Sequence, residues 1–349
     1  MDGSLTPLQF PVAAPPAPGE TLAIAPGVRW LRMPLPFALD HINLWLLEDG
    51  PGWTIVDTGY AMPETKALWQ RIFAGQLDGL PVTRIIVTHY HPDHIGLAGW
   101  LTEHWQAPLW ITEKEWLFAR VMSRDSDDFA PLRPNFARRA GLDQASSGLF
   151  GDREDSYRRG VPSVPPNFQR LEDGMKVEIG GRDWRVIVGE GHAPELACLY
   201  CAETRVLISG DQVLPKISPN ISVQAHEPDG DPLARYLRSL AKLREEVPPE
   251  TFVLPSHNLP FFGLHARIDT LAAHHAARCE EILAACEDPK TAMQLLPVLF
   301  RRILDRHQMG FALGEALAHA HYLVGQGLLD RVLGDDGANR FIRAYRQFS

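Results

Sequence analysis

The 349-residue chain is 45% hydrophobic and 22% charged, with a formal net charge of −9 at pH 7. This balance is typical of a globular protein, and it excludes a disordered or fibrous chain. The acidic excess argues against a surface built throughout to bind polyphosphate, although a local basic patch is compatible with it.

The sequence contains no run of 18 apolar residues and no pattern of a secretory leader. We therefore expect neither a membrane span nor export, and we expect a cytoplasmic location. Four cysteines are too few for a disulfide scaffold, which agrees with a reducing compartment. The length favours two domains.

Short strands and helices are predicted along the first third of the chain. Residues 1–20 are rich in proline and are predicted to form a loosely ordered lead-in to a domain over 21–263. Strands are predicted at 21–25, 28–33, 41–48 and 53–57, as the start of a mostly antiparallel sheet. A helix at 63–73 and an apolar strand at 83–88 follow, then a helix at 97–105, a strand at 108–112 and a helix at 113–122.

The middle of the chain changes character twice. Residues 123–168 are polar and rich in arginine, which predicts an irregular or helical insertion. Strands return at 175–179, 184–188, 197–201, 206–209 and 251–254. Two strand-rich halves separated by helices predict an α/β fold, an αββα sandwich of two mixed sheets flanked by helices.

The last segment, 264–349, is predicted to be a separate helical domain with long helices at 268–286 and 311–329 and a further one within 291–304. Residues 270–349 hold equal numbers of acidic and basic side chains. The charge of this segment therefore gives no support for nucleic-acid binding.

A dense group of polar residues follows the strand at 83–88. His89, His91, Asp93 and His94 lie within six positions, and burying so many polar groups without a partner would be unfavourable. Neutral imidazoles and carboxylates are ligands that suit Zn²⁺ and other first-row ions. The motif therefore predicts a metal site, in which His89 and His91 point at one metal and Asp93 and His94 at its neighbour.

The motif His-x-His-x-Asp-His after an apolar strand resembles the signature of the metallo-β-lactamase superfamily. Further segments are similar to the rest of that family's pattern, in the family's order: Asp57-Thr58-Gly59, Gly191-His192-Ala193-Pro194, Gly210-Asp211 and Ser256-His257. The chain departs from the pattern where relatives often carry Gly-His and it has Glu195-Leu196. A second departure is Asn258, where many relatives carry glycine.

The resemblance implies a site for two divalent cations, for which Zn²⁺ is favoured while Fe and Mn also fit. It places the first metal on His89, His91 and His192 and the second on Asp93, His94 and His257, with Asp211 bridging both. Asp57 would orient the ligands from behind, and Asp93 and Asp211 would be the catalytic carboxylates. Two such cations lower the pKa of a shared water molecule.

The resemblance also favours a function, a glyoxalase-II-like hydrolase of small ester or thioester substrates. A ribonuclease or other phosphodiesterase and a lactonase are the alternative enzymes, and a DNA-binding regulator with a metal-sensing site is the alternative from another class. The plan resembles the two-domain subset with a winged-helix-like C-terminal domain, which is compatible with a homodimer. Lys216, Asn220 and His226 follow Asp211 in the chain and are candidate substrate contacts.

Overall fold

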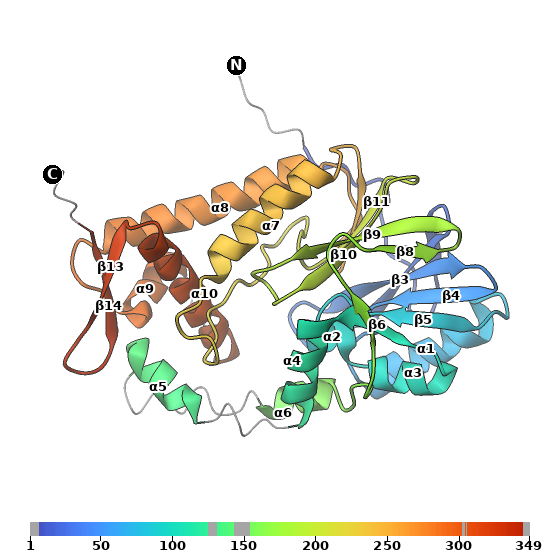
Figure 1. Cartoon of the computed structure of the whole chain (residues 1–349), viewed down its shortest axis with the longest axis horizontal. Coiled ribbons are helices and arrows are strands. Elements are labelled where there is room, and N and C mark those ends of the chain that lie inside the picture. The colour runs from blue at the N-terminus through green and yellow to red at the C-terminus, as the bar shows by residue number, and fades with distance from the viewer. Residues whose placement is uncertain (1–6, 125–130, 143–153, 302–303, 305, 345–349) are drawn as a thin grey trace, which may run out of the picture. The chain divides into compact units, whose positions relative to one another are not determined.

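The computed structural model describes residues 7–124, 131–142, 154–301, 304 and 306–344 (Figure 1). The chain divides into two compact units. The first unit combines residues 1–125, 155–219 and 240–268, and the second combines 126–154, 220–239 and 269–349. Within the expected lead-in, Gln9 exchanges two backbone hydrogen bonds with Phe262 of the first unit.

The first unit contains a seven-stranded sheet whose strands follow one another in chain order. They are β1 (Leu22–Ala25), β2 (Val28–Pro34), β3 (His41–Asp49), β4 (Gly52–Val56), β5 (Val82–Ile86), β6 (Leu109–Thr112) and β7 (Gln169–Leu171). Pairing is antiparallel from β1 to β4, with Trp30 opposite Trp45, and parallel from β4 to β7. The sheet is therefore mixed, not mostly antiparallel, because helices connect β4 to β5 and β5 to β6 and return the chain in the same direction.

Five of the described helices lie between the strands β4 and β7 of this sheet in chain order and belong at least mostly to the first unit. They are α1 (Pro63–Gly75), α2 (Pro92–Ile95), α3 (Ala98–Trp105), α4 (Glu113–Arg124) and α6 (Glu154–Gly160). Pro63 and Pro92 each occupy the first turn of a helix, where the missing amide hydrogen removes no hydrogen bond.

A second sheet of five strands has the order β12-β11-β10-β9-β8. Its strands are β8 (Lys176–Ile179), β9 (Arg182–Gly189), β10 (Leu196–Cys201), β11 (Val206–Gly210) and β12 (Phe252–Pro255). Only β11 and β12 pair in parallel, so this sheet is mixed as well.

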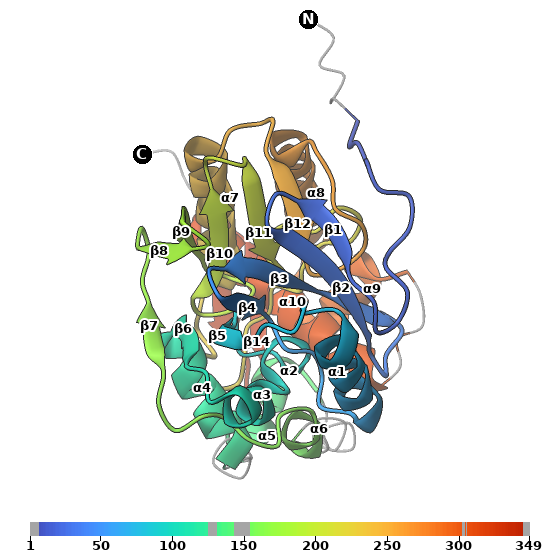
Figure 2. The same cartoon turned by 90° about the vertical axis from the view of Figure 1, so that its right-hand side faces the viewer.

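Alternating side chains of β3 enter two different cores. Leu44 belongs to the cluster that contains Trp69 of α1, whereas Trp45 belongs to the cluster that contains Trp184 of β9. One face of the first sheet therefore packs on helices and the other on the second sheet, as the period of two along a strand requires. Figure 2 shows the two sheets together with α1 and α3. The predicted α/β sandwich of two mixed sheets is confirmed.

Where it is described, the insertion predicted at 123–168 is partly helical and partly irregular, with residues 161–168 outside any helix or strand. It holds the end of α4, α5 (Leu132–Arg139) and α6, and its residues 125–130 and 143–153 lie outside the described part. Elements not predicted from the sequence include α2, β7 and α7 (Pro232–Glu246). The helix α7 was overlooked although Leu233, Tyr236 and Leu240 are buried at helical spacing.

The second unit holds most of the C-terminal elements. They are the greater part of α8 (Leu264–Ala285), then α9 (Ala292–Leu299), α10 (Arg306–Gly325) and a hairpin of β13 (Leu329–Leu333) and β14 (Asn339–Arg343). Thr291 and Gln294 form a capping box at the start of α9, which satisfies two amide donors. Among the described residues, no helix is long and apolar enough to span a membrane.

Candidate metal centre

The predicted ligands lie on loops that leave the ends of strands in the first unit. His89 and His91 follow β5 and lead into α2, which carries Asp93 and His94. The other three follow strands of the second sheet: His192 after β9, Asp211 after β11 and His257 after β12. Because β11 and β12 are parallel, their ends lie at the same edge of the sheet, which brings Asp211 and His257 together.

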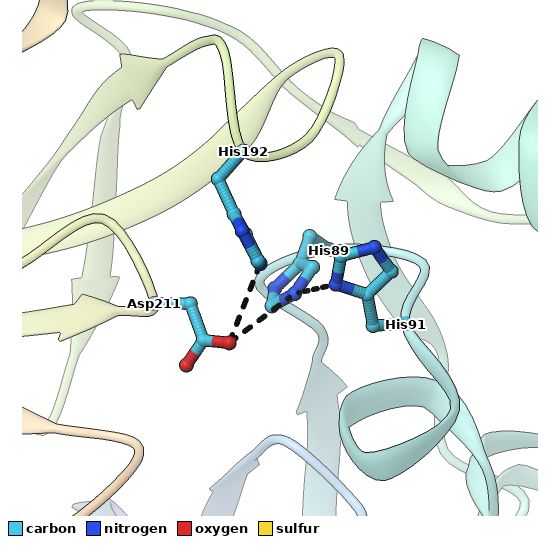
Figure 3. A group of neighbouring side chains, drawn as sticks. All are labelled: His89, His91, His192 and Asp211. Atoms are coloured by element: carbon cyan, nitrogen blue, oxygen red, sulfur yellow. Dashed lines mark hydrogen bonds and ion pairs between the residues drawn. The ribbon is translucent and has the colours of Figure 1, made fainter. Parts of the chain in front are cut away.

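A first group consists of His89, His91, His192 and Asp211, each of which offers one ligand atom within 4.8 Å of the others (Figure 3). His89 Nε2 lies 2.9 Å from His91 Nδ1, and His192 Nε2 lies 3.3 Å from Asp211 Oδ2. Since a zinc–ligand bond is about 2.0–2.2 Å long, two ligand atoms at these separations can bind one ion.

A second group consists of Asp93, His94 and His257, again within 4.8 Å of one another. Asp93 Oδ2 lies 3.7 Å from His94 Nε2 and 3.5 Å from His257 Nε2. Asp211 also reaches this group, with Oδ2 at 3.6 Å from His94 Nε2 and Oδ1 at 3.4 Å from His257 Nε2. Its carboxylate therefore lies between the two groups.

Asp57 fixes the orientation of His94. This buried carboxylate accepts hydrogen bonds from the amide and hydroxyl of Thr88 at 2.8 and 2.9 Å, and from Nδ1 of His94 at 2.8 Å. With a proton on Nδ1, the imidazole turns Nε2, the atom available to a metal, toward the other ligands. Asp57 has a φ of 62°, a left-handed conformation that aspartate tolerates better than most residues.

The His257 loop is held by contacts with β3. His257 Nδ1 lies 2.8 Å from the carbonyl oxygen of His41, which leaves Nε2 facing the second group. Asn258 has a φ of 68° and donates its amide hydrogen to His41 Nε2 at 2.9 Å. Glycine adopts this left-handed backbone freely, and asparagine adopts it more readily than most other residues.

Burial and neighbouring charges set the protonation of the groups. Burial and the adjacent imidazoles hold the pKa of His89 well below its usual value and lower the pKa of His91 to about 3. Burial would raise the pKa of Asp211, but the imidazoles of His257 and His94 outweigh it and hold that pKa well below its usual range. Neutral imidazoles at His89 and His91 and an ionised Asp211 are forms that bind a metal. Against the effect of burial, nearby carboxylates hold the pKa of His94 well above its usual value and raise that of His257 to about 10, so a metal would replace a proton on each of these two rings.

The buried Nε2 atom of His94 is evidence that the site binds a metal. Its Nε2 is buried and has no hydrogen-bond partner among the described residues. A buried polar atom without a partner is unfavourable by about 1–3 kcal/mol, and a cation bound by the second group would satisfy it. The donor set of imidazoles and carboxylates fits a divalent first-row ion.

Comparison with known proteins gives the family. The family model of the metallo-beta-lactamase superfamily matches residues 38–257, which is more than half of the chain. The chain belongs to the metallo-beta-lactamase superfamily. A second family model, the metallo-beta-lactamase-like C-terminal domain, matches residues 279–344.

Similar solved and curated proteins cover most of the chain. A beta-lactamase domain protein from Burkholderia ambifaria is 49% identical, with a TM-score of 0.89 over 97% of this chain and 98% of the other. A metallo-beta-lactamase family protein from Thermus thermophilus is 32% identical, with a TM-score of 0.78 over 92% and 100%. The probable metallo-hydrolase YqjP of Bacillus subtilis is 24% identical over 84% of this chain and 91% of its own. Together with the metal-ligand groups, these relatives identify a metal-dependent hydrolase.

The three residues predicted to contact the substrate do not all belong to the unit that holds the metal centre. Lys216 is exposed and belongs to the first unit with the metal centre, whereas Asn220 and His226 belong to the second unit. Asn220 Oδ1 accepts a hydrogen bond from Ser222 Oγ at 2.6 Å, and His226 is exposed. Their contact with substrate stays a prediction.

Two residues that hold the loops of this site were not predicted from the sequence. Thr88 bonds to Asp57, and its Oγ1 also lies 3.1 Å from Nδ1 of His89. Glu115 accepts amide hydrogens from Tyr90 and Glu195, which flank the ligands. No local signal could have found Glu115, because a glutamate in the first turn of a helix has an ordinary capping role.

Proposed function

We propose that the protein hydrolyses a small ester or thioester at a two-metal site formed by the two ligand groups. The observation that carries the proposal is the position of Asp211, whose two carboxylate oxygens face both groups at 3.3 to 3.6 Å. A shared carboxylate of this kind is suited to hold two ions side by side. Divalent cations there would supply a hydroxide nucleophile at neutral pH and polarise the substrate oxygen.

The chain's own residues would hold and orient the site. His89, His91 and His192 would bind one ion, and Asp93, His94 and His257 the other. Asp57 and the His41 carbonyl each take the Nδ1 hydrogen of one imidazole, which keeps Nε2 available. Zn²⁺ is the proposed metal, and Fe and Mn fit the same donors.

The charge of the chain favours a small ester or thioester substrate over a nucleic acid. The net charge of −9 and the balance of acidic and basic residues in the last 80 positions provide little attraction for a phosphodiester backbone. Lys216 remains the candidate substrate contact in the unit that holds the site.

For residues 264–349 we propose a winged-helix-like domain. The succession of α9, α10 and the β13–β14 hairpin supports it, since two helices followed by a hairpin wing are the core of that architecture. Acidic and basic side chains are equally numerous here, which argues against DNA binding. We propose that this domain serves substrate access or self-association.

The test is metal analysis followed by a substrate panel. The purified chain should contain about two equivalents of metal, and it should release thiol or acid from thioesters, esters or lactones faster than it cleaves phosphodiesters. The variant H91A is the control for a contaminating activity. Cleavage of single-stranded RNA alone, or saturable binding of duplex DNA with no turnover of any ester, would contradict the proposal.

A further inference from the structure

One carboxylate links the two loops that carry the histidines of the first ligand group. Glu115 lies in the first turn of α4 and is fully buried. Its Oε2 accepts the amide hydrogen of Tyr90 at 2.8 Å, and its Oε1 accepts that of Glu195 at 2.6 Å. Tyr90 stands between His89 and His91, and Glu195 comes three positions after His192.

Both peptide groups between His89 and His91 are fixed from outside the loop. The N–H of Tyr90 donates to Glu115, and its carbonyl accepts the hydroxyl hydrogen of Tyr157 at 2.7 Å. Tyr157 belongs to α6 and is buried. The direction of the chain from one histidine to the next is therefore set by α4 and α6.

The loop after His192 is attached to the same part of the chain. Thr112 Oγ1 donates to the carbonyl oxygen of Glu195 at 2.9 Å, and Lys114 Nζ forms a 2.8 Å ion pair with the Glu195 side chain. Glu195 occupies one of the positions at which the sequence departs from the family pattern. Its side chain thus has a partner in this chain, next to Glu115.

We propose that Glu115 is a positioning residue that fixes His89, His91 and His192 relative to one another for binding of the first metal. The inference rests on the proposed function, because it concerns the same ligand group. A buried carboxylate is retained only where it is well hydrogen-bonded, and both oxygens of Glu115 accept backbone hydrogens.

The test compares Glu115→Gln with Glu113→Gln. Glutamine keeps the shape of Glu115 but turns an NH₂ group toward one of the two backbone donors, so one loop loses its attachment. Glu113 lies two residues earlier on the same helix, is exposed and pairs with Arg170 at 2.6 Å, so the same Glu→Gln replacement there touches no ligand loop.

The measurement is a competitive titration of the metal-free full chain with Zn²⁺, which yields two dissociation constants. His192→Ala identifies the constant that belongs to the first group, because it removes a ligand of that group alone. E115Q should raise this same constant about 10- to 100-fold, the usual effect of losing a group that orients metal ligands. The other constant should stay unchanged, and E113Q should match wild type in both.

A Co²⁺ spectrum provides a second readout. In E115Q the absorption bands of the ion in the first group should shift, because the ligand geometry relaxes, while E113Q should keep the wild-type bands. If E115Q fails to fold, Tyr157→Phe carries the test, since it removes one hydroxyl and should weaken the same constant.

Each remaining outcome is decisive. A folded E115Q with both constants equal to those of wild type overturns the inference. Equal weakening of both constants together with a lower melting temperature also overturns it, because that pattern indicates general destabilisation. A wild-type chain that binds no Zn²⁺ overturns the proposed function instead, before any variant is compared.

Discussion

Replacing Asp57 by asparagine tests whether its hydrogen bond with His94 orients that ligand for metal binding. The carboxylate accepts three hydrogen bonds, two from Thr88 and one from His94 Nδ1. Asparagine has one acceptor oxygen and tolerates the left-handed backbone at φ 62°, so Asp57→Asn changes hydrogen bonding without adding backbone strain. Alanine would add that strain and confuse the result.

The expected magnitude follows from the lost contact with His94. If the side-chain oxygen of the new asparagine keeps its hydrogen bond from the Thr88 backbone N–H, its NH₂ group faces the hydrogen on His94 Nδ1. Two donors then face each other, and the hydrogen bond to His94 is lost. Losing a hydrogen bond to a charged acceptor costs about 1.5–3 kcal/mol. The imidazole can relieve this only by moving its hydrogen to Nε2, the atom that faces the metal. We therefore expect metal affinity to fall about 10- to 100-fold, which corresponds to about 1.4–2.7 kcal/mol.

The assay is a competitive Zn²⁺ titration with a melting curve of the metal-free chain. The matched control is Asp49→Asn at the other end of the β3–β4 hairpin, where a largely buried carboxylate accepts hydrogen bonds from Thr54, Thr83 and Arg84. Asp49→Asn should lower stability and leave Zn²⁺ affinity unchanged. Wild-type affinity in Asp57→Asn, or an equal loss of affinity in both variants, would refute the reasoning.

The other predictions concern catalysis, pH and backbone conformation. Either His91→Ala or Asp211→Ala should lower kcat/KM on the ester selected by the substrate panel at least about a hundredfold, with a wild-type circular dichroism spectrum, and full activity in either would remove its assigned role. Burial raises the pKa of Glu315 on α10 to about 7, against the opposing effect of Arg278. Between the ordinary pKa of 4.5 and about 7, the folded carboxyl is protonated while the unfolded one is ionised, so stability is lost as pH rises through this window and stays lower above it. The glutamine of Glu315→Gln cannot ionise, so this variant should be more stable than wild type at pH 8, by up to about 3 kcal/mol, but not at pH 4.5. Urea unfolding at the two pH values measures this. An equal difference in stability at both pH values would contradict the prediction. Asn258→Ala should lower the free energy of unfolding by about 1–2 kcal/mol relative to Asn258→Gly, because only glycine accepts a φ of 68° without strain, and equal stability of the two variants would count against that account.

Much of the fold class and of the ligand set could be predicted from the sequence. His89, His91, Asp93 and His94 lie within six positions after an apolar strand, so their closeness in space needs little more than a turn. Short apolar runs between turn signals predicted most strands of both sheets, because the period of two along a strand appears directly in the order of residues. The distant ligands were matched by resemblance to a family pattern and not by any local physical signal.

The tertiary structure decided what the sequence could not express. Parallel pairing of β4 to β7 depends on how the connecting helices pack, and no residue within those strands specifies it. The bonds from Asp57 to His94 and from Glu115 to Tyr90 and Glu195 join positions 37, 25 and 80 residues apart. A hydrogen bond requires its two atoms to lie about 3 Å apart, and between positions so distant in the chain only the packed sheets bring them there.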